Sequence, residues 1–332
     1  MHTNYGNIQV IGVSLSVREM GSRRSLLMNS KFVKPPIIIG GCGRSGTSVL
    51  LSILSAHPRI FAIPFETQAF CPTAYTNKLD MSAPFEVKEI SEYLSNAEVP
   101  NAAWRWCEKT PKNILFFGRI LEYFGRDVRL INIVRDGRDV ILSQHPNNPD
   151  RFYVPIDRWV DEVKAGMPFG SHPQVHVVYY EDLVNQPEKS IADICDFLDE
   201  DVDPAILDWH VHATVRKHSA WKGEVEQLHR GSLKKWESSE YRQRLADLLS
   251  DVEAVRLLKY YGYMDQKAKP AGNWRIKFTL KKAKRRIPAG IKTRIKEDFP
   301  FFQDFFQEKI CGRNIGIGTT LAPHRIKRIQ KD

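Results

Sequence analysis

The chain has 332 residues, of which 42% are hydrophobic and 27% are charged, and its formal net charge is +10. These proportions exclude a disordered or fibrous protein and are typical of a globular chain that forms one large α/β domain or two small ones. The positive charge predicts an anionic partner, which can be a nucleotide, an acidic polysaccharide, a lipid head group or nucleic acid.

In chain order, residues 1–34 show little periodicity and form a leader of uncertain order. From Pro35 onward, short apolar runs rich in β-branched residues alternate with segments of helical period. The expected strands are 36–41, 59–64, 103–108, 128–134 and 175–180. The expected helices are 46–57, 113–125, 138–145 and 188–199. This alternation predicts an α/β fold with a mostly parallel sheet covered by helices on both faces.

The composition changes after about Met264. Residues 265–332 are dense in Lys and Arg and contain the aromatic run FPFFQDFF. We therefore divide the chain into the leader 1–34, an α/β domain at 35–264 and a C-terminal extension at 265–332. The extension is expected to lie on an anionic membrane surface or to bind a polyanion, and the alternative is a solvated charged face.

A glycine-rich segment, GCGRSGTS at 41–48, joins the first expected strand to the first expected helix. Such a strand, turn and helix start form an anion site, because backbone N–H groups and the helix dipole point at the ligand. In a nucleoside-triphosphate P-loop a lysine stands at the position of Thr47. A ligand with one 5′ phosphate-linked group and no metal would suit the loop, and the alternative is a tight turn that binds nothing. The candidate binding residues are Gly43, Arg44, Ser45, Gly46, Thr47 and Ser48.

A second candidate anion site follows the expected strand at 128–134. Arg135 and Arg138 lie at its carboxyl end, where ligands sit in open parallel sheets. Ser143 lies eight residues beyond Arg135, on the helix expected at 138–145. An arginine fork and a hydroxyl would hold a second phosphate there. The alternative is a surface pair between arginine and Asp136 at a helix start.

In order and spacing, these two segments resemble those of the sulfotransferases that use 3′-phosphoadenosine-5′-phosphosulfate (PAPS). In that family a strand–loop–helix cradles the 5′-phosphosulfate and a later R-x₇-S element clamps the 3′-phosphate, which is the role the resemblance gives to Arg135 and Ser143. CEKTPKN at 107–113 resembles the central strand end of the carbohydrate and tyrosylprotein branches, and YYEDL at 179–183 is similar to another recurrent family segment. The resemblance spans about residues 35–262 and implies a P-loop-NTPase-like three-layer fold.

The resemblance also implies a mechanism. Glu66, in IPFETQAF, would be the general base, Lys109 would stabilise the bridging oxygen of the leaving phosphate, and Arg44 would serve the 5′-phosphosulfate. PAPS has no triphosphate, and its sulfuryl group carries less charge than a phosphoryl group, so neither the P-loop lysine nor a metal is required. Gln68 stands where the tyrosylprotein branch has an arginine, which makes a peptide tyrosine a less favoured acceptor.

Simpler roles exist for the same residues. Glu66 would complement a helix dipole if a helix began there, and Lys109 would be an ordinary surface lysine beside Glu108. His57 or His145 would be an alternative base. Cys42, in the loop, is expected to be a small buried hydrophobe rather than a nucleophile.

A late segment, HRGSLKKWES at 229–238, resembles the basic family loop that folds over the nucleotide. Arg230 and either Lys234 or Lys235 are candidates for the 3′-phosphate, and Trp236 is expected to pack in the core. WKG at 221–223 is a candidate for a mobile lid.

The sequence thus predicts a PAPS-dependent sulfotransferase whose acceptor is a hydroxyl or amine of a glycan or small metabolite. The alternatives are a P-loop kinase and a non-enzymatic polyanion- or membrane-binding protein. The five scattered cysteines form no C-x-x-C pair, and no apolar run approaches the roughly 20 residues that span a bilayer. A cytoplasmic protein is therefore expected, and the C-terminal extension could contact a membrane. Since the motifs predict a sulfotransferase, no nucleic-acid partner is expected.

Overall fold

The computed structural model describes residues 31–76, 78–145, 148–216, 228 and 230–265. The candidate lid at 221–223, most of the leader and nearly all of the C-terminal extension lie outside these residues. The strands are β1 (Ile37–Gly40), β2 (Ile60–Ala62), β3 (Arg105–Lys109), β4 (Arg129–Val134), β5 (Gln144–His145), β6 (Asn148–Phe152) and β7 (Val175–Tyr179).

Helices occupy much of the remaining described chain. The α-helices are α2 (Thr47–Ser55), α3 (Val87–Asn96), α4 (Phe117–Phe124), α5 (Gly137–Val140), α6 (Ile156–Gly166), α7 (Tyr180–Asn185), α8 (Pro187–Leu198), α9 (Pro204–Leu207), α10 (Trp209–His212), α11 (Arg242–Ser250) and α12 (Val252–Tyr260). The 3₁₀ helices are η1 (Pro111–Phe116), η2 (Met167–Phe169), η3 (Arg230–Ser232), η4 (Lys235–Glu237) and η5 (Ser239–Tyr241).

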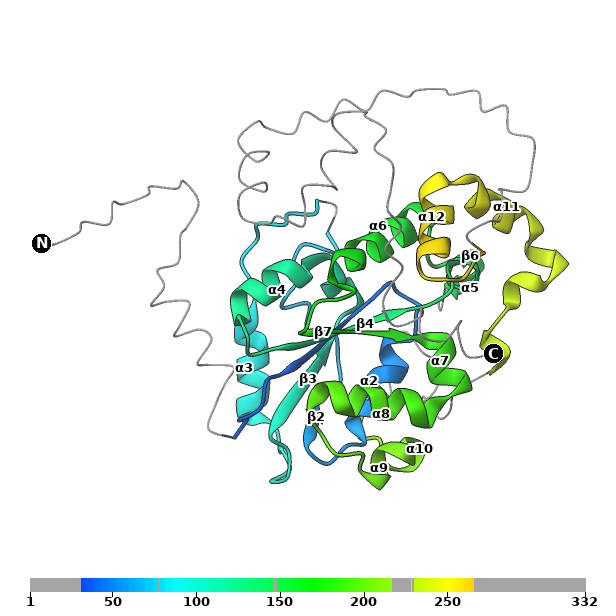
Figure 1. Ribbon diagram of the computed structural model, residues 1–332. Coiled ribbons are helices and arrows are strands. Elements are labelled where there is room, and N and C mark those ends of the chain that lie inside the picture. Colours follow the sequence, from blue (N-terminus) through cyan, green and yellow to red (C-terminus); the bar gives the residue numbers. More distant parts are fainter. Residues whose placement is uncertain (1–30, 77, 146–147, 217–227, 229, 266–332) are drawn as a thin grey trace, which may run out of the picture.

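Five strands form one sheet in the order β2-β3-β1-β4-β7, and all four pairings are parallel. Helices lie on both sides of this sheet, with α2 and α8 on one side and α4 and α6 on the other (Figure 1). The predicted fold class is thereby confirmed. Because β1 lies in the middle, its carboxyl end and the loop after it are flanked by the ends of β3 and β4.

The two faces of the sheet are buried in different clusters. Along β1, Ile37 and Ile39 pack with α2 and α8, whereas Ile38 packs with η1 and α4. This alternation is the period-two pattern of a strand that is covered on both faces. A third cluster joins α6, α11 and α12 beside the end of β4.

The five strands of this sheet were all predicted from the sequence. A helix also begins where one was expected, near Arg138, but it ends at Val140, so the placement of Ser143 on that helix is wrong. Only Gly137–Val140 is helical, capped by the Asp136 carboxylate that accepts a hydrogen bond from the Arg138 N–H. The chain then enters an antiparallel hairpin, in which Gln144 pairs with Phe152. Pairing within this hairpin uses the backbone groups that a longer helix would have needed.

Within the described residues no helix is both long and apolar enough to cross a bilayer. In the same part of the chain, no cluster of three His, Cys, Asp or Glu side chains has the arrangement of a metal site.

Candidate active site

The loop between β1 and α2 follows a path that only glycine permits at its tightest points. Gly46 has φ 99°, and a Cβ atom there would lie 2.5 Å from the ring of Tyr180, at the start of α7. A Cβ atom on Gly41 would lie 2.4 Å from the carbonyl oxygen of Ile133 in β4. The loop is therefore pressed against β4 and α7, with the nine-residue helix α2 directly after it.

Two buried polar atoms near this loop have no hydrogen-bond partner among the described residues. They are the hydroxyl of Ser45, which is fully buried, and Nε of Arg135. Arg44 adds a guanidinium 5.9 Å from the ring of Tyr153, and burial, followed by the charge of Arg135, lowers the Arg44 pKa. Buried donors without partners are rare in folded proteins, so these groups fit an anion bound at the loop.

Arg135 connects the loop to a distant part of the chain. Its Nη1 donates to the carbonyl oxygen of Arg44 at 3.0 Å, and its Nη2 donates to the carbonyl oxygen of Ser232 in η3. Its guanidinium also lies 4.4 Å from the ring centroid of Tyr180, whose hydroxyl lies 2.9 Å from Ser232 Oγ. The structure thus brings together the two predicted anion sites and the segment at 229–238.

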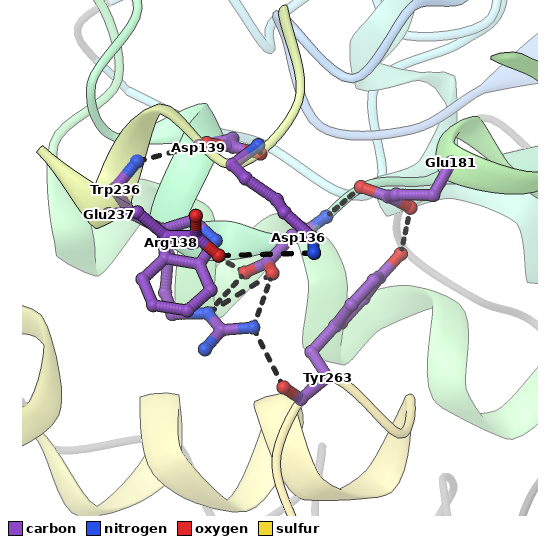
Figure 2. Close-up of polar contacts among 8 residues, drawn as sticks. Asp136, Arg138, Asp139, Glu181, Trp236, Glu237 and Tyr263 are labelled. Carbon is purple, nitrogen blue, oxygen red and sulfur yellow. Dashed lines mark hydrogen bonds and ion pairs between the residues drawn. The ribbon is translucent and has the colours of Figure 1, made fainter. Parts of the chain in front are cut away.

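Arg138 has a different role, which Figure 2 shows. Its Nη2 donates to Asp136 at 2.6 Å and to the carbonyl oxygen of Tyr263 at 2.8 Å, and its guanidinium stacks on the ring of Trp236. Glu181 accepts hydrogen bonds from the Asp136 N–H and the Tyr263 hydroxyl. The alternative for this segment was a surface pair between arginine and Asp136. An Arg–Asp pair exists, but Arg138 makes it, and Asp136 is buried rather than at the surface.

Ser143 and the late basic segment meet around Asp139, which is buried in α5. The carboxylate of Asp139 accepts from the N–H groups of Lys234 at 2.8 Å and Trp236 at 3.4 Å, and burial raises its pKa. Ser143 lies just beyond α5, with Oγ 3.5 Å from the Asp139 carbonyl oxygen. Arg230 and Lys234 are exposed, so their side chains lie at the rim rather than inside the fold.

Glu66 and Lys109 form an ion pair of 2.6 Å at the carboxyl edge of the sheet. Lys109 ends β3, its side chain is fully buried, and its ammonium also donates to Ser48 Oγ at 3.3 Å. Burial lowers the Lys109 pKa, against the opposing charge of Glu66. The side chain of Glu66 is 21% exposed, in a loop where no helix begins. Both simpler roles, the surface lysine and the helix-start carboxylate, are therefore wrong.

A buried carboxylate, Glu108, fixes the backbone on either side of this pair. It accepts hydrogen bonds from the hydroxyls of Thr67 and Thr110 and from Nδ2 of Asn113 at 2.7 Å. The same Asn113 group reaches the carbonyl oxygen of Ile39 at 3.2 Å. Glu108 thus ties the loop that carries Glu66 to the ends of β3 and β1.

We expect Glu108→Ala to destabilise the fold, because three buried donors would lose their common acceptor. The expected loss is about 3 kcal/mol in the free energy of unfolding, which corresponds to a melting temperature lower by roughly 5–10 °C. Thermal unfolding followed by circular dichroism measures it, with the exposed Glu98→Ala as the matched control. Equal melting temperatures for the two variants would refute the bracing role.

Two other side chains that could act as a nucleophile or a base, Cys42 and His57, are buried. Cys42 is buried, and burial raises the pKa of its thiol well above the ordinary value. His57 is buried, with Nε2 3.0 Å from the carbonyl oxygen of Asp201 and Nδ1 accepting from the Arg59 N–H. Neither side chain can therefore take a proton from an acceptor at the loop. His145 is half-buried in β5, beside the ring of Tyr153.

Sequence reasoning missed Tyr180, which contacts Gly46, Arg135 and Ser232 at once. The sequence signal for Tyr180 is the YYEDL segment, which contains it, but the segment alone does not indicate these contacts. Sequence reasoning also missed Glu108, which lies directly beside Lys109 in CEKTPKN. In both cases the motif was found, but the contact that gives the residue its role depends on the fold.

The chain is similar to known proteins over this region. A model described as "Sulfotransferase family" matches residues 35–204, which is half of the chain. A Caenorhabditis briggsae protein named "Putative protein-tyrosine sulfotransferase" is 29% identical over 194 residues, covering 52% of this chain and 69% of that protein.

Two solved structures are similar at a lower level. The sulfotransferase domain of the Synechococcus PCC 7002 olefin synthase is 20% identical, covering 71% of this chain and 98% of that domain, with a TM-score of 0.48. A mouse sulfotransferase complexed with PAP is 16% identical, covering 74% of this chain and 94% of that one, with a TM-score of 0.43. Both TM-scores lie below 0.5, so we assign the fold from the strand order and the loop described above and not from these structures.

Proposed function

The chain belongs to the sulfotransferase family and is an enzyme of sulfuryl transfer, and we propose that it uses PAPS to sulfate a hydroxyl or amine of a glycan or small metabolite. The observation that carries this proposal is the ion pair between the partly exposed Glu66 and the buried Lys109, whose ammonium contacts Ser48 at the phosphate loop. A base and a cation beside an anion site are what sulfuryl transfer from a phosphate requires.

The donor fits the residues present. The loop at 43–48, with the unpartnered hydroxyl of Ser45 and the guanidinium of Arg44, would hold the 5′-phosphosulfate. The unpartnered Nε of Arg135, together with Ser143, would hold the 3′-phosphate. Arg230 and Lys234 would add positive charge at the exposed rim. When bound, PAPS supplies the sulfuryl group and a phosphate as the leaving group.

Glu66 would accept the proton of the acceptor as the new bond to sulfur forms. Lys109 would neutralise charge on the bridging oxygen as the bond to phosphate breaks, by analogy with the charge stabilisation of phosphoryl transfer. The ion pair of 2.6 Å keeps both groups at the loop before substrates arrive. The acceptor would displace part of that pair, so that the Glu66 carboxylate can turn toward it.

The proposed acceptor class is supported by the residue at position 68, near Glu66 in the sequence. The relative from Caenorhabditis briggsae is named for a protein-tyrosine acceptor. At Gln68 this chain departs from the tyrosylprotein motif, which favours a glycan or small metabolite over a peptide tyrosine. Of the alternatives, a kinase would need a P-loop lysine, but Thr47 stands there. The cytoplasmic location and a membrane contact through 265–332 stay predictions.

If the Lys109 ammonium acts on the leaving phosphate, we expect transfer to fall at alkaline pH as that group loses its proton. Burial lowers the Lys109 pKa below its ordinary value of 10.5, so the fall should be centred below pH 10.5. Lys109→Arg should move the fall to higher pH, because a guanidinium keeps its charge. Release of adenosine 3′,5′-bisphosphate from PAPS, with a monosaccharide as surrogate acceptor, measures the profile, because a sugar hydroxyl does not itself titrate in this range.

Lys112→Arg is the matched control, because Lys112 is a nearby lysine whose pKa is also lowered by burial. Its profile should keep the wild-type position. A profile that Lys109→Arg leaves in place would remove Lys109 from the mechanism.

A further inference from the structure

A second, partly buried ion pair lies at the phosphate loop, at Gly43, whereas the Lys109–Glu66 pair contacts the loop at Ser48. Arg158 and Glu162 are one turn apart on α6, with Arg158 Nε 2.8 Å from Glu162 Oε1. The side chain of Glu162 is 3% exposed, and its other oxygen accepts a hydrogen bond from the Gly43 N–H at 3.3 Å. The loop is therefore attached to α6 through this carboxylate.

The guanidinium of Arg158 packs directly on the loop. A Cβ atom at Gly43 would lie 2.8 Å from Arg158 Nη2 and 3.4 Å from the ring of Tyr153. The Tyr153 ring centroid lies 5.3 Å from Arg158 Cζ and 5.9 Å from Arg44 Cζ, so one aromatic ring is shared by two guanidinium groups. Glu162 occupies Nε of Arg158, and no described residue accepts from its Nη atoms.

Both ion pairs contact the phosphate loop. Lys109 Nζ donates to Ser48 Oγ at 3.3 Å, and Glu162 accepts from the Gly43 N–H at 3.3 Å. Arg158, which is paired with Glu162, lies against Gly43. A group bound at the loop would therefore meet Lys109 at Ser48 and Arg158 at Gly43.

We propose that Arg158 is a further catalytic residue that contacts the sulfuryl group of the donor, and that Glu162 is a positioning residue that holds Arg158 against the loop. This inference rests on the proposed use of PAPS. In the transfer step the acceptor oxygen forms a bond to sulfur, the bond from sulfur to the phosphate oxygen breaks, and its electron pair stays on the phosphate. The acceptor proton goes to Glu66. Arg158 stabilises the negative charge on the sulfuryl oxygens throughout.

Adenosine 3′,5′-bisphosphate (PAP) provides a sharp test, because it keeps both phosphates of PAPS and lacks the sulfuryl group. We expect Arg158→Ala to weaken binding of PAPS by about tenfold or more, since a charge-assisted hydrogen bond is lost. Affinity for PAP should stay within about twofold. Isothermal titration calorimetry of both nucleotides measures the ratio of the two dissociation constants, which a merely structural role would not change.

The exposed Arg151→Ala, on β6, is the matched control and should alter neither constant. Arg158→Gln keeps the size of the side chain and should change the ratio in the same direction if Arg158→Ala folds poorly. An equal loss of affinity for both nucleotides, or no loss for either, would overturn the contact with the sulfuryl group. If the wild-type protein bound neither nucleotide, the donor assignment would fail and the role of Arg158 with it.

Discussion

Glu66→Gln is expected to lower the rate of sulfuryl transfer by about 10²- to 10⁴-fold, the usual contribution of a general base. The substitution keeps the size of the side chain and an oxygen that can accept from Lys109, so the local structure should persist. It removes the ability to take a proton from the acceptor. Affinity for PAP should stay within about twofold, because the loop and Arg135 are untouched. Release of PAP from PAPS measures the rate, with a monosaccharide as surrogate acceptor, because its hydroxyl stays protonated until a base removes the proton.

Glu98→Gln is the matched control, because Glu98 is an exposed carboxylate that is remote from the loop in the sequence. Its rate should equal that of the wild-type protein. If Glu66→Gln also retained a near-normal rate, Glu66 would not be the base. The carboxylate of Glu162, which already contacts the loop, would then be the next candidate.

Arg135→Ala is expected to weaken PAP binding by about 100-fold, because a guanidinium that makes charge-assisted hydrogen bonds to a phosphate would be lost. The specific signature is the preference for PAP over adenosine 5′-monophosphate, which lacks the 3′-phosphate. The wild-type protein should show that preference, and Arg135→Ala should lose most of it. Calorimetric titration with the two nucleotides measures both constants.

Arg138→Ala, three residues further along, is the matched control. Its guanidinium is already engaged by Asp136, Tyr263 and Trp236, as Figure 2 shows, so its loss should lower stability rather than change nucleotide preference. If Arg138→Ala lost the preference for PAP and Arg135→Ala kept it, Arg138 and not Arg135 would be the residue that binds the 3′-phosphate.

The parallel sheet could be predicted from the sequence because its strands are short, apolar and buried on both faces. The end of the helix that starts near Arg138 could not be predicted correctly, because it is set by a hairpin in which Gln144 pairs with Phe152. Helix α6 was missed although Ile156, Trp159, Val160 and Val163 have helical spacing after a proline. The helical spacing of these apolar residues was therefore sufficient to predict α6.

The residues of the candidate site also differ in how well the sequence predicts them. Gly43–Ser48 and Arg135 lie in local motifs, so they could be named before their contacts were known. Glu66 and Lys109 were named through a resemblance, and their ion pair depends on how the loop after β2 lies against β3. Tyr180 and Arg158 approach the loop from α7 and α6, far along the chain. Contacts of this kind follow from packing and leave no local pattern in the sequence.

The most direct test of the account is a comparison of two ligands on the wild-type protein. Thermal unfolding is measured with increasing PAP in the presence of EDTA, and separately with ATP and Mg²⁺. A ligand at 100 times its dissociation constant adds about 2.7 kcal/mol of stability, which raises the melting temperature by roughly several degrees. We expect this rise with PAP alone, and we expect the chelator to leave it unchanged. A rise with ATP and Mg²⁺ and none with PAP would contradict it and would favour a kinase.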